Sequence, residues 1–237
     1  MNFGPLIFLG LFVTMAISWC GLILTPQRQL GRQSPALIEE TGQLYPSDRP
    51  GAAHQGQEVY RANGCYYCHT RQVTGNDVGR WGSRITVAQD FLYDDPVMLG
   101  RQRVGPDLAN IAARNPDIRW HLLHLYNPQI TSKGSTMPGY RFLFQQRAMS
   151  GGQVSTEALP LTGKDAPPAG FEIIPKAEAY QLVHYLLSQR FDIGLLEAPM
   201  PQAKKRSGTN APPAATASTN NAATNSAQPA PANPPAK

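Results

Sequence analysis

Residues 64–69 read GCYYCH and constrain the structure of this chain more than any other segment. Two cysteines stand two residues apart and a histidine directly follows the second, the C-x-x-C-H pattern that is typical of c-type haem attachment. On a helical turn this spacing puts both sulfurs on one side of a porphyrin ring, and the adjacent histidine reaches the iron. The motif therefore predicts one covalently bound haem c, held by Cys65, Cys68 and His69.

Other interpretations of the two cysteines have less support from the surrounding sequence. A thioredoxin-like redox pair expects a βαβ context, and the flanking residues do not have that pattern. A zinc site needs further ligands, but no second C-x-x-C follows. The remaining cysteine, Cys20, stands alone in an apolar run, so the three cysteines do not form a disulfide framework.

A haem held by one histidine needs a sixth ligand, and Met137 is the main candidate. It lies in the loop GSTMPG at residues 134–139, where the following proline stiffens the backbone that presents the sulfur. Histidine–methionine ligation raises the haem potential and suits electron transfer. The alternatives are Met98, or a second histidine ligand from His121 or His124, which are three residues apart and could instead be polar groups on the surface.

Residues between the motif and Met137 are candidates for contacts around the haem. The Pro106 carbonyl, in the stretch GPDL at residues 105–108, can accept the free Nδ1–H of the proximal histidine and fix its tautomer. Four further side chains could contact the haem propionates or could be solvated loop residues: Trp81, Arg84, Arg101 and Arg103.

The N-terminal run at residues 5–24 carries no charged side chain. At about 1.5 Å rise per residue a helix of this length spans about 30 Å, the hydrocarbon thickness of a bilayer. A cleaved signal peptide is the alternative, but the run is long for one, no A-x-A site follows and no basic residue precedes it. We expect an uncleaved, single-pass anchor.

The side of the membrane follows from the predicted haem rather than from charge. Arg28 and Arg32 follow the apolar run, and the positive-inside rule would place them in the cytoplasm. Haem is attached to C-x-x-C-H outside the bacterial cytoplasm, which is the stronger requirement. We therefore expect a haem domain on the periplasmic side of a bacterial inner membrane.

The chain divides into four predicted parts with different compositions. They are a transmembrane anchor (1–27), a connector (28–54), a cytochrome c domain (55–198) and an Ala/Pro/Asn-rich tail (199–237). The tail lacks the apolar residues needed to offset ordering entropy and is predicted to be disordered. A net charge of +5 without dense Lys/Arg runs does not indicate nucleic-acid binding.

The predicted domain is mainly α-helical, with long loops. Helices are expected at residues 56–63, at 118–126 with Asn115 as N-cap and Pro116 in the first turn, and from Pro175 to 190. Residues 70–114 and 129–172 are expected to be mostly loop. Such loops normally argue against a compact domain, but a large prosthetic group would give them a partner to pack around.

The order of these motifs resembles the mono-haem subunit (subunit II) of cbb3-type cytochrome c oxidases. The resemblance covers residues 1–144, and residues from 145 onward depart from the common family pattern. It rests on the FGPLIFLG anchor, GCYYCH, Phe91-x-Tyr93-Asp94-x-Pro96, Gly105-Pro106-Asp107-Leu108, Trp120-His121, Asn127-Pro128 and Met137-Pro138.

The resemblance implies a class I cytochrome c-like domain and a place in a respiratory complex. The family subunit passes electrons from a di-haem cytochrome c subunit, or from a soluble cytochrome c, to a haem-copper catalytic subunit that reduces oxygen to water. This chain would then have no catalytic site of its own. The alternatives are the haem c subunit of a nitric oxide reductase, a free-standing membrane-tethered electron carrier, and a haem-based sensor or peroxidase with an exchangeable sixth ligand.

Overall fold

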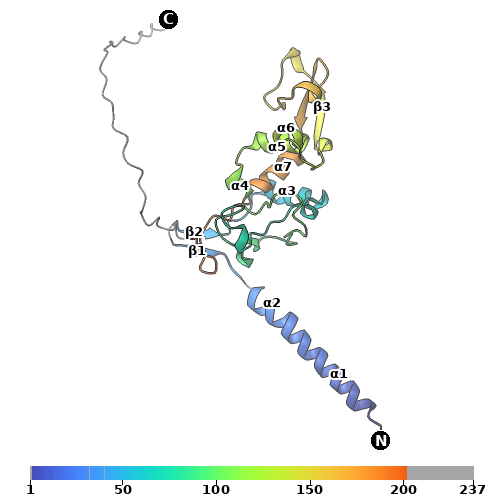
Figure 1. Ribbon diagram of the computed structural model, residues 1–237, viewed down its shortest axis with the longest axis vertical. Helices are drawn as coiled ribbons and strands as arrows, with labels where there is room; N and C mark the ends of the chain where they lie inside the picture. The colour runs from blue at the N-terminus through green and yellow to red at the C-terminus, as the bar shows by residue number, and fades with distance from the viewer. Residues whose placement is uncertain (1, 32, 40, 202–237) are drawn as a thin grey trace, which may run out of the picture. The chain divides into compact units, whose positions relative to one another are not determined.

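The computed structural model describes residues 2–31, 33–39 and 41–201 (Figure 1). The N-terminal segment is one uninterrupted apolar helix, Gly4–Gln29, that is long enough to cross a membrane and has none of its residues buried. Its consecutive parts are α1 (Gly4–Trp19), a π-helical turn (Cys20–Leu24) and α2 (Thr25–Leu30). The predicted disordered tail falls almost entirely on residues 202–237, which lie outside the described residues.

Two helices from opposite ends of the haem domain form its frame. Helix α3 (Gly51–Ala62) packs against α7 (Ala177–Leu187), and the two lie together at the centre of the domain in Figure 1. They approach closely at Gly56, where a Cβ atom would stand 1.8 Å from the Gln181 carbonyl oxygen. Beside it, the Tyr60 and Tyr185 rings pack with centroids 5.2 Å apart.

Shorter helical elements complete the domain. Three of them are α4 (Ile111–Arg114), α5 (Ile118–Tyr126) and α6 (Pro128–Thr131). The 3₁₀ turns are Cys65–Tyr67, Gly75–Asp77, Ala88–Phe91, Arg141–Leu143, Ser150–Gly152 and Gly163–Asp165. The expected loop at 70–114 therefore contains several single turns of helix.

The helix boundaries differ from the sequence expectations at several points. Helix α3 begins at Gly51, ahead of the expected start at residue 56, and α7 ends at Leu187, before the expected end at residue 190. Helix α5 occupies the expected residues, but its N-cap is Asp117, whose carboxylate accepts a hydrogen bond from the Arg119 backbone N–H, rather than Asn115. Pro175 ends a strand and does not begin the last helix, which starts at Ala177 after Lys176 in an extended conformation. From the sequence alone, Pro175 could be either the first residue of the helix or the last residue of a preceding strand.

The structure contains two antiparallel hairpins. Strands β1 (Ala36–Ile38) and β2 (Gln43–Tyr45) pair within the connector. Strands β3 (Phe144–Ala148) and β4 (Phe171–Pro175) pair with Phe144 opposite Pro175, although residues 129–172 were expected to be mostly loop. The β3–β4 pair adds a short sheet that packs its inward residues on the core.

The core is one main apolar cluster and one smaller cluster. The smaller one gathers Val73, Phe91, Ala109 and Phe191. The main one unites α3, α5, α7 and the β3–β4 hairpin through Tyr60, Met98, Ile111, Leu122, Leu125, Tyr126, Leu143, Phe144, Leu159, Ile173, Ala179, Leu182, Val183, Tyr185 and Leu186.

The connector is fastened to the haem domain by buried polar contacts. The Gln89 side-chain amide donates to the carbonyl oxygens of Ser34, at 2.9 Å, and Tyr45, at 3.0 Å. The Tyr45 hydroxyl donates to Asp90 at 2.6 Å, and Arg49 forms an ion pair with the buried Asp94 carboxylate. Gln89, Asp90 and Asp94 are buried, so these contacts attach the connector firmly to the folded domain.

Candidate haem site

The C-x-x-C-H motif lies on a tight helical turn directly after α3. Gly64 adopts a left-handed conformation, with φ of 65°, and so ends the helix. The chain then forms the 3₁₀ turn Cys65–Tyr67, and the His69 backbone N–H donates to the Cys65 carbonyl at 3.0 Å. Cys65 is partly buried and Cys68 is exposed, and both are free thiols. This is the local geometry that the spacing predicted.

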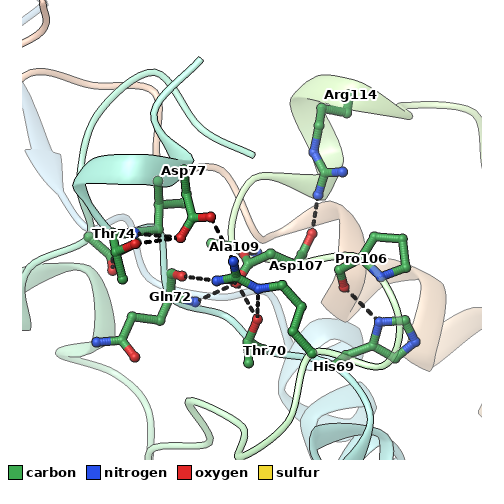
Figure 2. A network of polar contacts seen from close by, with 12 residues as sticks. His69, Thr70, Gln72, Thr74, Asp77, Pro106, Asp107, Ala109 and Arg114 are labelled. Atoms are coloured by element: carbon green, nitrogen blue, oxygen red, sulfur yellow. Dashed lines mark hydrogen bonds and ion pairs between the residues drawn. The ribbon is translucent and has the colours of Figure 1, made fainter. Parts of the chain in front are cut away.

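The His69 imidazole is oriented by the loop that contains Pro106. Its Nδ1 lies 2.8 Å from the Pro106 carbonyl oxygen (Figure 2). A carbonyl can only accept, so Nδ1 carries the proton and donates it, which leaves the Nε2 lone pair available to a metal. Burial lowers the pKa of His69 and so favours the neutral imidazole, the form that binds metals.

Gly105 lets the same loop lie directly against the imidazole. A Cβ atom at residue 105 would stand 2.4 Å from His69 Cε1 and 2.8 Å from Nδ1. The Gly105 backbone N–H also donates to the Cys68 carbonyl at 3.0 Å, which joins the loop to the motif. Two thiols on a turn and an imidazole with a free Nε2 fit an iron porphyrin bound through both vinyl groups.

Asp107 connects the loop to the segment that follows the motif. Its fully buried carboxylate accepts from the Thr70 hydroxyl at 2.6 Å and from the Gln72 backbone N–H at 2.9 Å (Figure 2). Its other oxygen accepts from the Ala109 backbone N–H at 2.8 Å. Because Pro106 precedes it directly, Asp107 sets where the Pro106 carbonyl points. The sequence pattern predicts a role for Pro106 in the GPDL stretch and none for Asp107, two of whose partners lie more than 30 residues earlier.

Arg103 belongs to this network. Its guanidinium donates to the Thr70 hydroxyl at 2.7 Å, to Asp77 at 2.7 Å, to the Gln72 carbonyl at 2.8 Å and to Asp107 at 3.2 Å. The hydrogen bonds from Arg103 and Thr74 lower the pKa of Asp77 to about 2. Arg103 therefore joins the segment that follows His69, residues 70–77, to the loop that contains Pro106.

The other residues expected near the propionates lie in different settings. Arg101 is exposed, and Trp81 is partly buried with the guanidinium groups of Arg80 and Arg114 within 5 Å of its ring centre. Arg84 is buried and donates to Asp90 twice, to the Tyr45 hydroxyl and to the carbonyls of Ile85 and Ile193. These contacts use all five N–H groups of the Arg84 guanidinium and leave none for a propionate.

Met137 is partly buried and packs against the main core cluster, as Cys65 and Tyr140 also do. The loop around it is internally bonded, since the Met137 backbone N–H donates to the Ser135 hydroxyl at 3.3 Å. The alternative Met98 is a member of the same cluster and is only 5 % exposed. The methionine in the loop and the cysteine of the motif thus share one apolar environment.

The two histidines of α5 are less exposed than surface polar groups would be. His121 is buried, and its Nε2 donates to the Asn115 carbonyl at 2.8 Å. His124 stacks on Trp120 with ring centroids 4.8 Å apart, and its Nδ1 lies 2.6 Å from the Thr131 hydroxyl. Burial lowers the pKa of His124 to about 4, with smaller contributions from the neighbouring histidines, so this ring is neutral at physiological pH.

Together these features define a class of protein. The domain is mainly helical and follows an apolar N-terminal helix in the chain. It presents one oriented histidine directly after a pair of thiols, which is the site of a mono-haem cytochrome. Within residues 2–31, 33–39 and 41–201 no group of three or more His, Cys, Asp or Glu side chains is arranged to hold a metal ion by itself.

The comparison with protein families identifies the family to which the chain belongs. The family described as "cytochrome c oxidase, mono-heme subunit/FixO" matches residues 6–161, and the chain belongs to this family. A comparison with curated proteins returned no match. Family membership makes haem the cofactor and an oxidase complex the setting, and with the apolar helix it supports anchoring in a membrane. The recognition of a cbb3-type oxidase subunit in the sequence is confirmed.

Proposed function

We propose that this chain is a membrane-anchored c-type cytochrome that relays electrons to the haem-copper catalytic subunit of a cbb3-type terminal oxidase. The observation that carries the proposal is the turn at residues 65–69 with its histidine oriented by the Pro106 carbonyl. The family adds that related chains are mono-haem oxidase subunits.

Cys65 and Cys68 are the proposed points of covalent attachment. Their two S–H groups would hold the porphyrin through one thioether bond each, formed by addition across its two vinyl groups. No oxidant is consumed. The attached haem supplies a one-electron iron couple. Their place on one tight turn, directly before His69, supports this assignment.

His69 and Met137 are the residues proposed to hold the haem iron. The Pro106 hydrogen bond holds His69 with Nε2 free, and the loop around Met137 packs on the same core cluster as Cys65. A neutral thioether favours the reduced iron and raises the potential. Two protein ligands leave no open position for a substrate, which supports electron transfer over a sensor or peroxidase role.

Arg101, Arg103 and Trp81 are the proposed neighbours of the haem propionates. Arg101 is exposed, and Arg103 makes four hydrogen bonds, which leave one N–H of its guanidinium for a further acceptor. Arg84 is left out of the proposal because all five of its N–H groups already donate within the protein.

The short link between anchor and domain favours a fixed relay over a free-standing carrier. Helix α2 ends at Leu30, and the Ser34 carbonyl is already bound by Gln89. The intervening residues can span at most about 14 Å, since each extended residue covers about 3.6 Å. A domain held this closely cannot travel far between partners, which suits a permanent subunit.

The proposed donor is a di-haem cytochrome c subunit or a soluble cytochrome c, and the proposed acceptor is the catalytic subunit. The haem domain is proposed to lie on the periplasmic side of a bacterial inner membrane, where haem is attached to C-x-x-C-H motifs. The apolar helix, Gly4–Gln29, supports a single pass through the bilayer.

The metal content of the complex tests the proposal. The full chain is purified through a tag in mild detergent, and haem types, copper and non-haem iron are determined in the material that accompanies it. Copper with haem b and covalent haem c is the expected result. Haem b with non-haem iron and no copper would indicate a nitric oxide reductase. Covalent haem c alone, in several detergents, would indicate a tethered carrier and overturn the oxidase proposal.

A further inference from the structure

Both ends of the loop that carries Met137 are bound by one carboxylate. The Asp165 oxygens each accept from the Asn127 side-chain amide at 3.0 Å, and Oδ1 also accepts from Arg141 at 2.7 Å. Asn127 stands before α6, on one side of Met137, and Arg141 stands just after the loop on the other side. Asp165 therefore joins the two points at which the loop leaves and rejoins the domain.

The contact continues by hydrogen bonds toward Met137. The Asn127 Oδ1 accepts from the Gln129 backbone N–H at 3.1 Å and so caps α6. The Gln129 side-chain amide donates to the Ser135 carbonyl at 2.9 Å, and the Ser135 hydroxyl accepts from the Met137 backbone N–H at 3.3 Å. Asp165 is thus connected to the Met137 backbone through three intermediate residues, Asn127, Gln129 and Ser135.

The setting of Asp165 makes these bonds effective. Its side chain is 8 % exposed, so water competes little for the carboxylate oxygens. Arg141 is 59 % exposed, and its ion pair alone would contribute little. A carboxylate that is sheltered from water and accepts hydrogen bonds contributes more than an exposed ion pair.

Asp165 comes from a part of the chain that the family comparison does not reach. It ends the 3₁₀ turn Gly163–Asp165, in the long connection between β3 and β4, whereas the family match ends at residue 161. The β3–β4 hairpin returns this connection to the domain, which brings Asp165 to a loop almost 30 residues earlier.

We propose that Asp165 is a positioning residue for the axial methionine: it holds the Met137 loop closed and so keeps the sulfur at the iron. The inference rests on the proposed role of Met137 as ligand. An external ligand can bind the ferric iron only while the loop is open, so its apparent affinity rises in proportion to the open fraction.

Imidazole is the probe, titrated into the oxidised, detergent-solubilised holoprotein while the methionine–iron charge-transfer band is followed. For Asp165→Asn we expect an apparent imidazole affinity about tenfold higher than wild type, which corresponds to about 1.4 kcal/mol. Met137→Ala lacks the sulfur ligand altogether and so shows the highest imidazole affinity that opening of the loop can produce. Glu157→Gln, an exposed carboxylate in the same connection, is the matched control and should match wild type.

A variant that weakens the domain elsewhere distinguishes the positioning role of Asp165 from a purely structural one. Gly56→Ala disturbs the contact of α3 with α7 and should lower the melting temperature without raising imidazole affinity. If Asp165→Asn does not yield holoprotein, Arg141→Gln takes its place, with an expected rise of about threefold because it removes one of the three hydrogen bonds.

The results discriminate between the inference and the proposal beneath it. A tenfold rise for Asp165→Asn, or a threefold rise for Arg141→Gln, with Glu157→Gln unchanged supports the inference. Wild-type affinity in the Asp165 or Arg141 variant, when Met137→Ala has lost the band, overturns the positioning role alone. A Met137→Ala protein that keeps the band and the wild-type affinity overturns the ligand assignment and the inference with it.

Discussion

Replacing Gly105 by alanine tests whether the loop backbone lies against the proximal histidine. The new Cβ atom would stand 2.4 Å from His69 Cε1, 2.8 Å from Nδ1 and 3.0 Å from Nε2. Carbon atoms in contact stand about 3.5–4.0 Å apart, so the loop and the ring must separate by about 1 Å. Gly105 does not have a left-handed backbone, so alanine adds steric pressure without backbone strain.

The separation has two measurable consequences. Overpacking of this kind costs about 1–3 kcal/mol, which lowers the melting temperature by about 2–4 °C for each kcal/mol. It also stretches the 2.8 Å hydrogen bond from His69 to the Pro106 carbonyl beyond hydrogen-bonding range. That bond makes the imidazole a stronger donor and favours ferric iron, so losing about 1 kcal/mol of it raises the potential by about 40 mV.

The assay is a redox titration of the purified holoprotein followed by its visible spectrum, with a thermal melt of the same sample. Gly75→Ala is the control, because a Cβ atom at residue 75 meets no atom within 4 Å. It should leave both quantities unchanged. If Gly105→Ala also keeps the wild-type potential and melting temperature, the loop backbone does not lie against the His69 imidazole.

Three further substitutions test other parts of the account. Met137→Ala should lower the potential by roughly 100 mV or more, within the range of about 0.8 V that axial ligands set, and a redox titration with an unchanged potential would exclude Met137 as ligand. Gly56→Ala places a Cβ atom 1.8 Å from the Gln181 carbonyl and should cost about 3 kcal/mol or more in a denaturant melt; a wild-type midpoint would contradict the α3–α7 contact. The pKa of Asp77 is lowered to about 2, chiefly by Arg103, so its ionised form stabilises the fold above about pH 4 and this contribution disappears as the pH falls toward 2. Melting temperatures of Asp77→Asn should therefore vary less than those of wild type in this window, and parallel curves would show that Asp77 makes no such contribution.

The sequence predicted a helix well where its apolar face and its bounding residues lie in one short stretch. The helix at residues 118–126 has its apolar face and its bounding polar residues within one short stretch, and α5 occupies those residues. The N-cap was assigned to Asn115 because asparagine before proline is a common start. The structure uses Asp117 because its carboxylate reaches the Arg119 backbone N–H.

The β3–β4 hairpin was missed because its partners are far apart in the sequence. Phe144 pairs with Pro175 across a long connection, so no tight-turn signal joins the two strands. The strand FQQRA also lacks the apolar alternation that indicates a half-buried strand. The pairing of β3 with β4 and the burial of Ile173 and Ile174 in the core favour the extended conformation.

As with the helices, the parts of the candidate site that lie close together in the sequence were predictable. Cys65, Cys68 and His69 are adjacent in the sequence, and the structure also brings the Pro106 carbonyl to the histidine. Arg84 could not be assigned from the sequence, because its partners depend on how the connector folds back as far as Tyr45. The contact of Asp165 with the Met137 loop depends on the β3–β4 hairpin, so no local pattern predicts it.

The most direct test of the relay is the rate at which the haem of this chain gives its electron to the partner subunit. The purified complex is reduced without oxygen and mixed rapidly with oxygen, and the oxidation of covalent haem c is followed in wild type and in Met137→Ala. We predict oxidation of this haem at least as fast as steady-state turnover, and a different rate when its potential is shifted by the substitution. Oxidation slower than turnover, or identical in the two proteins, would contradict electron transfer through this chain.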